Sequence, residues 1–438
     1  MFRSTICKLL LGIAASATFT PVPSPAQNFK SHFENKTLRV DYIFEGSDKE
    51  QSIAVDELAV IDGWAGRVTN LDSIPLHGNG IITMSDAKTG KAIYKTSFST
   101  LFQEWQGTEE ATRIRKAFEN VFLLPMPKDS ADVNVSLYDL KGRTSVSFTH
   151  CVRPNDILIR PLRPSELPPH RYLKKSALPD AIDIAILAEG YTAAEAEDFY
   201  AHAQTAVEEL FSYSPFKEYA GCFNVVAVAL PSAESGVSVP SQRQWKKTAL
   251  SSHFDTFYSS RYLTTLRLRQ MHDALTGIPY EHIIILANTD NYGGGGIYNS
   301  YTLATARHAA FAPVVVHEFG HSFAGLADEY YYDDQYTQFY YKDTEPWEQN
   351  ITTLKDFHSK WEDMLPKNTP IPTKADAKHP ERIGVYEGAG YQSKGVYRAF
   401  LDCRMKTNEA KAFCAVCQRA IKRLIQFYVE DADRNRIQ

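Results

Sequence analysis

Cysteine, net charge of one sign and long apolar runs are all scarce in this 438-residue sequence. Six cysteines are too few for a small disulfide-stabilised scaffold. A formal charge of −5, from 47 Lys plus Arg against 52 Asp plus Glu, lacks the basic excess that holds phosphate backbones, so we expect no nucleic-acid partner. The 24 tyrosines and 24 phenylalanines exclude a disordered or collagen-like chain, and the length suffices for two globular domains.

The longest apolar stretch lies at the start of the sequence. Two basic residues precede an apolar run at 9–17, and small residues follow up to Ala26. This order is typical of a secretory signal peptide, and the run is too short to span a bilayer. We therefore expect a signal peptide over residues 1–26, cleaved after Ala26 with Ala17 as the alternative. We expect no transmembrane segment, and a mature protein that is secreted or kept in the periplasm or cell envelope.

Residues 27–152 have the pattern of an all-β domain. Short stretches of alternating apolar and polar residues, such as 81–84 and 92–98, are separated by turn residues. Several short strands with hairpin turns predict a β-sandwich. A helix-like stretch at 109–120 interrupts the strands. The region contains no catalytic spacing, and we interpret it as a module that positions or caps a second domain.

A proline-rich segment at 153–180 separates this region from the rest of the chain. Its six prolines predict a stiff linker and a domain boundary. Strand-like apolar stretches follow at 181–188, 223–230 and 282–288. Helical patterns alternate with them, one opened by a capping box at Thr192 and Glu195 and another over 262–276. The alternation predicts an α/β domain with a mainly parallel sheet over residues 181–438.

One stretch in this second region carries chemistry: HEFGHSFAGLADEY, residues 317–330. His317 and His321 lie one helical turn apart, where both imidazoles can reach one ion at about 2.0 to 2.1 Å. Glu318, beside the first of them, can take a proton from a metal-activated water and hand it to a leaving amine. The spacing predicts a catalytic zinc site, against the plainer alternative of a helix with two ordinary histidines.

A catalytic zinc needs a third protein ligand and one open position. Gly325 can adopt the left-handed conformation that ends the helix, and the returning chain then brings Asp328 or Glu329 toward the ion. We favour Asp328 over Glu329, and not both, because two carboxylates would cancel the charge of the ion. A downstream glutamate, Glu345 or Glu348, is the remaining alternative, although neither lies in a clear second helix.

The motif resembles that of the metzincin metallopeptidases, HExxHxxGxxH or HExxHxxGxxD. Here the glycine comes one residue late, Ala327 takes the usual place of the third ligand, and Asp328 follows it. Two downstream segments accompany this offset, Cys403-Arg-Met405 and Phe413-Cys-Ala-Val-Cys417. Together these three features make the sequence similar to the bacterial IgA peptidase family of secreted zinc metallopeptidases. The resemblance covers about residues 180–428 and, more loosely, the β-rich region before them.

The resemblance implies a metzincin-like α/β zinc peptidase domain. It implies Zn²⁺ bound by His317, His321 and Asp328, and Met405 in a turn that forms a hydrophobic floor beneath the imidazoles. The plainer interpretation of Met405 is a residue that fills the core. In this fold class an extended peptide adds to a sheet edge before the zinc helix, and the glycines at 293–296 would admit it; a mobile surface loop is the alternative.

We therefore predict a secreted zinc-dependent endopeptidase that cleaves protein or peptide substrates, with Glu318 as general base. A zinc hydrolase of a non-peptide amide or ester is the first alternative. A non-catalytic binding protein of the cell envelope with a structural zinc is the second, and Glu318 argues against it because a structural site needs no base.

Two further clusters leave alternatives open. Six tyrosines within 330–341, with Asp333 and Asp334 among them, could form a rim over the cleft, a Ca²⁺ site or ordinary surface packing. Cys403 could bridge to Cys414 or Cys417, or the three could stay as buried thiols. A thiolate zinc site is the less favoured choice, since export favours oxidation.

Overall fold

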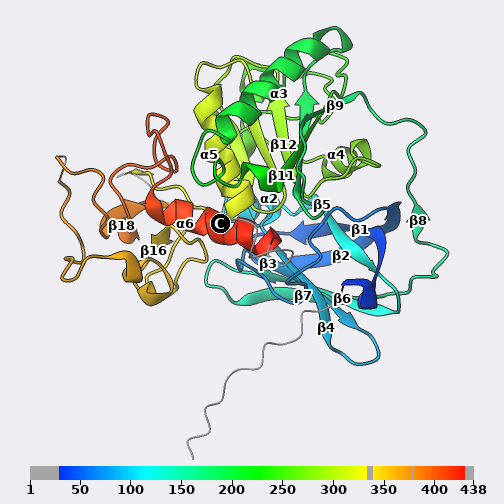
Figure 1. Ribbon diagram of the computed structural model, residues 1–438, viewed down its shortest axis with the longest axis horizontal. Coiled ribbons are helices and arrows are strands. Elements are labelled where there is room, and N and C mark those ends of the chain that lie inside the picture. Colours follow the sequence, from blue (N-terminus) through cyan, green and yellow to red (C-terminus); the bar gives the residue numbers. More distant parts are fainter. Residues whose placement is uncertain (1–28, 333–338, 377, 430–438) are drawn as a thin grey trace, which may run out of the picture.

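The computed structural model describes residues 29–332, 339–376 and 378–429 (Figure 1). The protein is a mixed α/β structure with four sheets, three of four strands and one of six, and few helices. The expected signal peptide at 1–26 lies outside the described residues. Among the helices of the described ranges, none has the length and apolarity needed to cross a membrane.

Residues 29–161, called here the first part, form two largely antiparallel sheets of order β5-β1-β2-β8 and β4-β3-β6-β7. A short helix, α1 (Phe29–His32), precedes the strands. The strands are β1 (Phe33–Gly46), β2 (Gln51–Asp62), β3 (Gly80–Asp86), β4 (Ala92–Phe98), β5 (Lys116–Pro127), β6 (Ala131–Tyr138), β7 (Thr144–Val152) and β8 (Arg160–Pro161). The predicted strands at 81–84 and 92–98 pair as β3 and β4. Burial alternates residue by residue along β6, as expected of a strand with one face in the core.

The prediction of a helix at 109–120 was wrong. A single 3-10 turn, Glu110–Thr112, is followed by β5, which pairs antiparallel with β1. The charged residues at its start favour a helix locally, and apolar alternation begins only near Phe118. Pairing with a distant strand therefore overrides local propensity. The helix of this region, α2 (Leu101–Gln106), lies just before it and is capped by the Thr100 side chain.

Residues 162–429, the second part, are built on a six-stranded sheet of order β13-β14-β12-β10-β11-β9. The strands are β9 (His170–Lys174), β10 (Ile182–Glu189), β11 (Phe223–Val228), β12 (His282–Ala287), β13 (Gly294–Ile297) and β14 (Tyr301–Thr305). The four inner strands are parallel, and β9 and β13 run antiparallel at the two edges. The proline-rich segment is thus more than a linker, because it supplies β8 to the first part and β9 to this sheet.

Four helices belong to this part: α3 (Ala196–Leu210), α4 (Leu268–Ala274), α5 (Phe311–Ala324) and α6 (Ala415–Val429). The capping box of Thr192 and Glu195 forms as predicted, in the 3-10 turn that leads into α3. By contrast, α4 covers only the later half of the helix expected at 262–276. In Figure 1, α3 and α5 lie on the same face of the sheet and α6 crosses below them.

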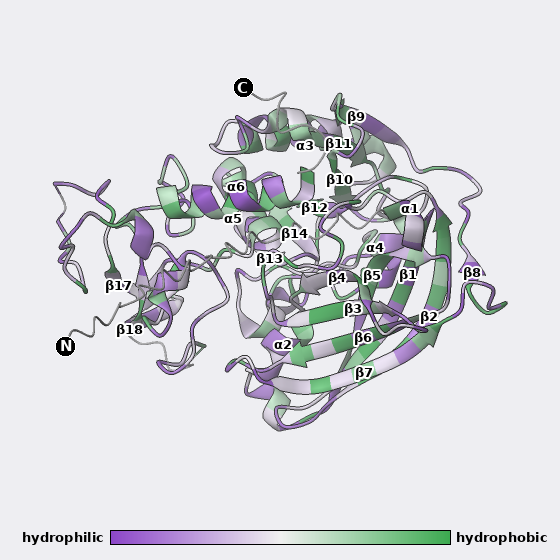
Figure 2. Ribbon diagram, turned by 60° about the horizontal axis from the view of Figure 1, so that its bottom comes forward, coloured by the Kyte–Doolittle hydropathy of each residue, from purple (hydrophilic) through white to green (hydrophobic). Residues whose placement is uncertain are grey.

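The central strand β10 is buried on both faces. Ile184 and Ile186 pack with the core of α3, α5 and α6, whereas Ala185 and Leu187 pack with the core of the first part. This explains its apolar run over 184–188, which is typical of parallel strands covered on both sides. Figure 2 shows the apolar residues along the strands of the first part, which form the core that Ala185 and Leu187 join.

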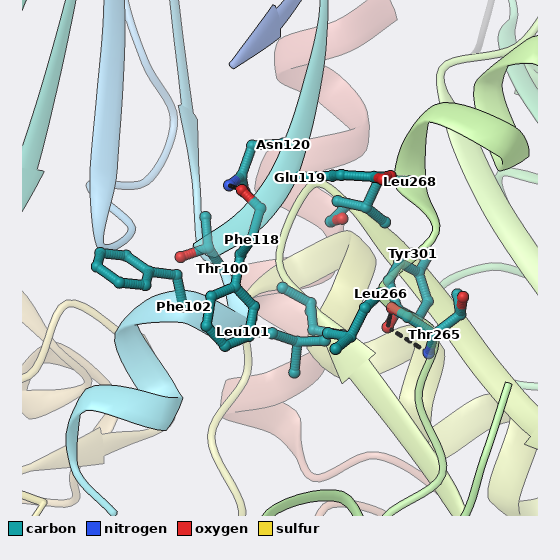
Figure 3. Close-up of a pocket in the computed structure, with 12 residues that line it drawn as sticks. Thr100, Leu101, Phe102, Phe118, Glu119, Asn120, Thr265, Leu266, Leu268 and Tyr301 are labelled. Atoms are coloured by element: carbon teal, nitrogen blue, oxygen red, sulfur yellow. Dashed lines mark hydrogen bonds between the residues drawn. The ribbon is translucent and has the colours of Figure 1, made fainter. Parts of the chain in front are cut away.

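The two parts also meet around a small cavity between α2, β5 and the segment before α4 (Figure 3). Leu101 and Phe118 of the first part face Leu266 and Tyr301 of the second. Tyr301 donates a hydrogen bond to the carbonyl oxygen of Thr265 at 2.9 Å, which orders the segment that lines the cavity. The cavity is lined by none of the motif residues, so we assign it to packing rather than to chemistry.

The remaining sheet lies beyond α5 and is formed by β15 (Tyr331–Tyr332), β16 (Ile351–Thr352), β17 (Tyr386–Ala389) and β18 (Tyr391–Arg398). Both β15 and β16 pair with β18, as does β17. The other 3-10 turns are Ala193–Glu195, Ala220–Cys222, Pro240–Gln242, Thr256–Tyr258, Phe357–Ser359 and Glu362–Met364. The strands of this sheet share a small core with the motif, in which Ala327 packs with Ile351, Ala389 and Val396.

Candidate metal centre

Helix α5 presents His317 and His321 side by side, with 3.0 Å between their Nε2 atoms. The Nδ1 of His317 lies 2.9 Å from the carbonyl oxygen of Arg404, and the Nδ1 of His321 lies 2.5 Å from that of Leu326. A carbonyl oxygen only accepts, so each Nδ1 carries the proton and donates it. Both Nε2 atoms are then free to bind a cation, the arrangement usual for metal-ligating histidines.

The chain turns back at Gly325 as predicted. This residue is left-handed, with φ of 55°, and its N–H bonds to carbonyl oxygens of the last helical turn. A side chain here would also collide with the Trp347 ring, 2.5 Å from the position of a Cβ. The turn carries Asp328 back, so that its Oδ1 lies 3.0 Å from His317 Nε2 and 3.3 Å from His321 Nε2.

The three atoms form a set that fits a divalent metal. Their separations of 3.0 to 3.3 Å are close to the edge of a tetrahedron of ligands at 2.0 to 2.1 Å, about 3.3 Å. Asp328 Oδ1 is fully buried and has no hydrogen-bond donor among the described residues. Three lone pairs thus converge on one point, and two imidazole nitrogens with one carboxylate oxygen are ligands that zinc accepts.

The electrostatic interactions of these side chains favour a positive charge between the three ligand atoms. Burial opposes protonation of His321, yet the Asp328 carboxylate outweighs it and raises the pKa of His321 to about 9. Burial alone would raise the pKa of Asp328, but the two imidazoles lower it well below its usual range. Either protons or a metal ion can supply that charge, and a metal ion satisfies all three atoms at once.

Glu329 points away from the histidines. Its backbone N–H donates to the carbonyl oxygen of Met405 at 2.8 Å, and its carboxylate accepts from the Asn350 amide at 3.0 Å. The carboxylate also lies 3.1 Å from the Cys417 sulfur. Of the two adjacent carboxylates, Asp328 is therefore the one that the structure brings to the imidazoles.

The downstream glutamates are also engaged elsewhere. Glu345 accepts a hydrogen bond from the Thr353 hydroxyl at 3.1 Å, and Glu348 accepts one from the Tyr340 hydroxyl at 3.0 Å. Neither is grouped with the histidines among the described residues that could hold a metal ion. The alternative of a distant glutamate ligand thus has no support in the geometry.

Glu318 lies where α5 meets the edge strand β13. A Cβ on Gly294 would lie 2.8 Å from the Glu318 carboxylate, and one on Gly296 would lie 2.3 Å from the Glu318 carbonyl oxygen. The glycines therefore form a strand packed against the helix, not a loop. The sheet edge next to α5 is β13, whereas the expected strand at 282–288 forms β12 inside the sheet. Burial raises the pKa of Glu318.

Met405 is fully buried beneath α5. Its sulfur lies 2.7 Å from the position of a Cβ on Gly320, so the helix and the methionine are in direct contact one residue before His321. The preceding residue, Arg404, supplies the carbonyl oxygen that orients His317. This placement agrees with the floor that the family resemblance implies.

Sequence reasoning missed Tyr391 and Glu104. The Tyr391 hydroxyl, on β18, donates to Asp328 Oδ2. Glu104, on α2 of the first part, accepts from the Tyr262 hydroxyl at 2.5 Å. Both side chains line the same cleft as His317. No local pattern marks either residue, because each reaches the cleft only through the tertiary fold.

The cleft is lined by both parts of the chain and by several residues of the tyrosine-rich segment. Tyr330, Tyr332, Tyr340 and Tyr341 lie along it, which agrees with the rim interpretation. Asp333 and Asp334, the carboxylates of the alternative Ca²⁺ site, lie outside the described residues.

Comparison with known proteins gives two family matches. The family described as IgA Peptidase M64 matches residues 172–376 and 374–425, and the family described as Peptidase M64 N-terminus matches residues 28–149. No curated protein matches the chain. Among solved structures, a metalloproteinase-II from Bacteroides fragilis aligns at 11% identity and a TM-score of 0.22, over 61% of this chain and 86% of that one.

Proposed function

Because the chain belongs to the IgA peptidase M64 family, and is thus a metallopeptidase that hydrolyses peptide bonds, we propose that it is a zinc-dependent endopeptidase. The zinc ligands are His317, His321 and Asp328. The observation that supports this is the convergence of three ligand atoms, 3.0 to 3.3 Å apart, at the helix that carries Glu318. Membership of a peptidase family also sets aside the two alternatives raised by the sequence.

Each residue around the metal centre has a distinct role in this proposal. A zinc ion, when bound, supplies Lewis acidity that polarises the scissile carbonyl and lowers the pKa of water. Glu318 accepts the proton of the attacking water and passes it to the leaving amine. Tyr391 holds Asp328 Oδ2 and leaves Oδ1 directed at the imidazoles. The backbone carbonyls of Arg404 and Leu326 keep both imidazoles in the required tautomer.

The shape of the cleft favours a long substrate. Its lining includes Asp139 and Arg143 of the first part, the motif helix and Asn408. A chain lying in such a cleft continues on both sides of the scissile bond, as an internal peptide bond requires. The edge strand β13 lines the cleft next to Glu318, where an extended peptide can run alongside it.

The same proposal covers the architecture and the location of the protein. The two sheets of the first part form a β-sandwich domain over 27–152, and the second part is a metzincin-like catalytic domain over 181–438 that follows the linker at 153–180. A signal peptide at 1–26 directs the chain out of the cytoplasm. The two parts pack in one core, and residues of both line the cleft, which supports the role of the first part as a module that positions the second.

A cleavage profile on a peptide library, read by mass spectrometry, tests the function. The chain without residues 1–26 should cut internal peptide bonds and stop when a chelator is added. Glu318→Gln should keep its metal and lose about 10² to 10⁴-fold of turnover, the usual contribution of a positioned acid–base group. Glu208→Gln, at an exposed position of α3, is the matched control. A loss of only a few-fold in Glu318→Gln would show that Glu318 is not the base.

A further inference from the structure

A second cluster of metal-ligand side chains lies behind the histidines. Glu329, Cys403, Cys414 and Cys417 are all buried, and their ligand atoms lie within 4.8 Å of one another. They come from the chain after α5, the turn before Met405 and the start of α6. We call them the cysteine cluster, and His317, His321 and Asp328 the histidine cluster.

The sulfurs of the cysteine cluster are close but not bonded. All five described cysteines are free, so the bridge from Cys403 to Cys414 or Cys417 considered from the sequence is not formed. The sulfurs of Cys403 and Cys417 are 3.7 Å apart, whereas a disulfide bond measures about 2.05 Å. In a tetrahedral zinc site with sulfurs at about 2.3 Å from the ion, two sulfurs lie about 3.8 Å apart.

Spacing and hydrogen bonding fit a thiolate site as well. Cys414 and Cys417 form a Cys-x-x-Cys pair at the start of α6, which is the usual half of a structural zinc site. The backbone N–H of Cys414 donates to the sulfur of Cys403 at 3.2 Å, a contact that favours a negatively charged sulfur.

Glu329 provides the fourth ligand position of the cysteine cluster. Its Oε1 accepts from Asn350, but its Oε2 is buried without any hydrogen-bond partner among the described residues. An unpartnered carboxylate oxygen in the protein interior is costly. A carboxylate oxygen of Glu329 lies within 4.8 Å of the three sulfurs, and its Oε1 is 3.1 Å from the Cys417 sulfur. The nearby buried guanidinium of Arg398 offsets part of the negative charge that four such ligands would carry.

We propose that Glu329, Cys403, Cys414 and Cys417 bind a second divalent metal, zinc, in a closed four-ligand site. Binding displaces the thiol protons and leaves no open position, so the site is structural rather than catalytic. It is a separate site from the histidine cluster and does not depend on the catalytic proposal.

The position of this site gives it a supporting role. Cys403 is two residues from Met405, and Arg404 between them orients His317 through its carbonyl oxygen. Glu329 follows Asp328 and bonds to the Met405 carbonyl oxygen. A metal that ties Glu329 and Cys403 to α6 therefore holds both the segment carrying Asp328 and the turn beneath the imidazoles.

Metal counting on the chain without residues 1–26, purified without reductant, tests the proposal. Inductively coupled plasma mass spectrometry should find two equivalents of zinc per chain. Cys414→Ser combined with Cys417→Ser should lose one and keep the other, while His321→Ala should lose the opposite one. Cys151→Ser, which removes an exposed free thiol, is the control and should keep both.

A spectrum assigns the metal even where the cysteine variant fails to fold. His321→Ala loaded with Co²⁺ should retain a near-ultraviolet sulfur-to-cobalt charge-transfer band, because its remaining metal is bound by thiolates. Absence of the band, or a disulfide among Cys403, Cys414 and Cys417 in a non-reducing peptide map, would overturn the proposal. A single zinc that disappears entirely in His321→Ala would do the same while leaving the catalytic site intact as a hypothesis.

Discussion

Asp328 and Glu329 are adjacent in the sequence, yet each belongs to a different cluster. The histidine cluster offers nitrogen and oxygen and borders the cleft, with side-chain exposures of 13% and 16% for His317 and His321. The cysteine cluster offers sulfur and oxygen and is sealed, with Cys403, Cys417 and Glu329 at 0% exposure. A metal site that does chemistry needs an open position, whereas one that only stabilises the fold closes around its ion.

The comparison shows how one turn can serve two purposes. In the segment after Gly325, the Asp328 side chain points to the imidazoles and the Glu329 side chain points to the sulfurs. Each carboxylate accepts a hydrogen bond from a partner of its own: Asp328 from Tyr391, and Glu329 from Asn350. The two clusters should therefore respond to different mutations.

The largest expected effect is that of His321→Ala. It removes a ligand from the histidine cluster, so metal at this site and turnover should both fall by more than the 10- to 100-fold of an indirect change. The cysteine cluster should keep its metal. His358→Ala, at a side chain that is 91% exposed, is the control. Full metal content in His321→Ala would contradict the ligand assignment.

Exchanging the two adjacent carboxylates tests the comparison directly. Asp328→Ala should weaken metal binding at the histidine cluster by at least 10- to 100-fold. Glu329→Ala should instead weaken binding at the cysteine cluster and change the histidine cluster only a few-fold. Chelator competition, followed separately for each metal, measures both. If Glu329→Ala released the metal of the histidine cluster and Asp328→Ala did not, the two assignments would have to be reversed.

Tyr391→Phe should have a smaller effect on the histidine cluster alone. The change removes the hydroxyl that donates to Asp328 Oδ2, and the loss of such a partner costs about 10- to 100-fold in metal affinity. We expect the lower end, since the buried ring remains in place. Tyr397→Phe, on the same strand, is the matched control. Equal chelator resistance in both variants would show that the hydroxyl does not support the ligand.

The grouping of His317, His321 and Asp328 could be predicted from the sequence because its signal is local. His317, His321 and Gly325 lie on one helix and its end, where spacing alone determines geometry. The cysteine cluster was harder to predict, since three sequence segments meet there and only the fold brings Glu329 to the sulfurs. The same reason explains why Tyr391 and Glu104 were missed. The strand β5, mistaken for a helix, also depends on a distant partner, β1.

The smallest expected effect concerns a third imidazole, on the far side of α5. His282 packs against the rings of Phe323 and Tyr428, with centroids 4.8 and 5.5 Å away, and its Nε2 has no hydrogen-bond partner among the described residues. Burial lowers the pKa of His282 from 6.5 to about 3, in contrast to the raised pKa of His321. The pKa values of these two histidines, on the two sides of α5, are thus shifted in opposite directions.

This contrast predicts how stability depends on pH. Below pH 6.5 the unfolded chain protonates His282 while the folded chain does not, so stability is complete above 6.5 and falls as the pH drops toward 3. At one pH unit below 6.5 the loss from this residue is about 1.4 kcal/mol. His282→Phe should therefore lose about that much less stability than the unchanged protein between pH 8 and pH 5.5, as measured by denaturant unfolding. His358→Phe, at an exposed position, should follow the unchanged protein, and an identical pH dependence in His282→Phe would show that this imidazole is not held neutral.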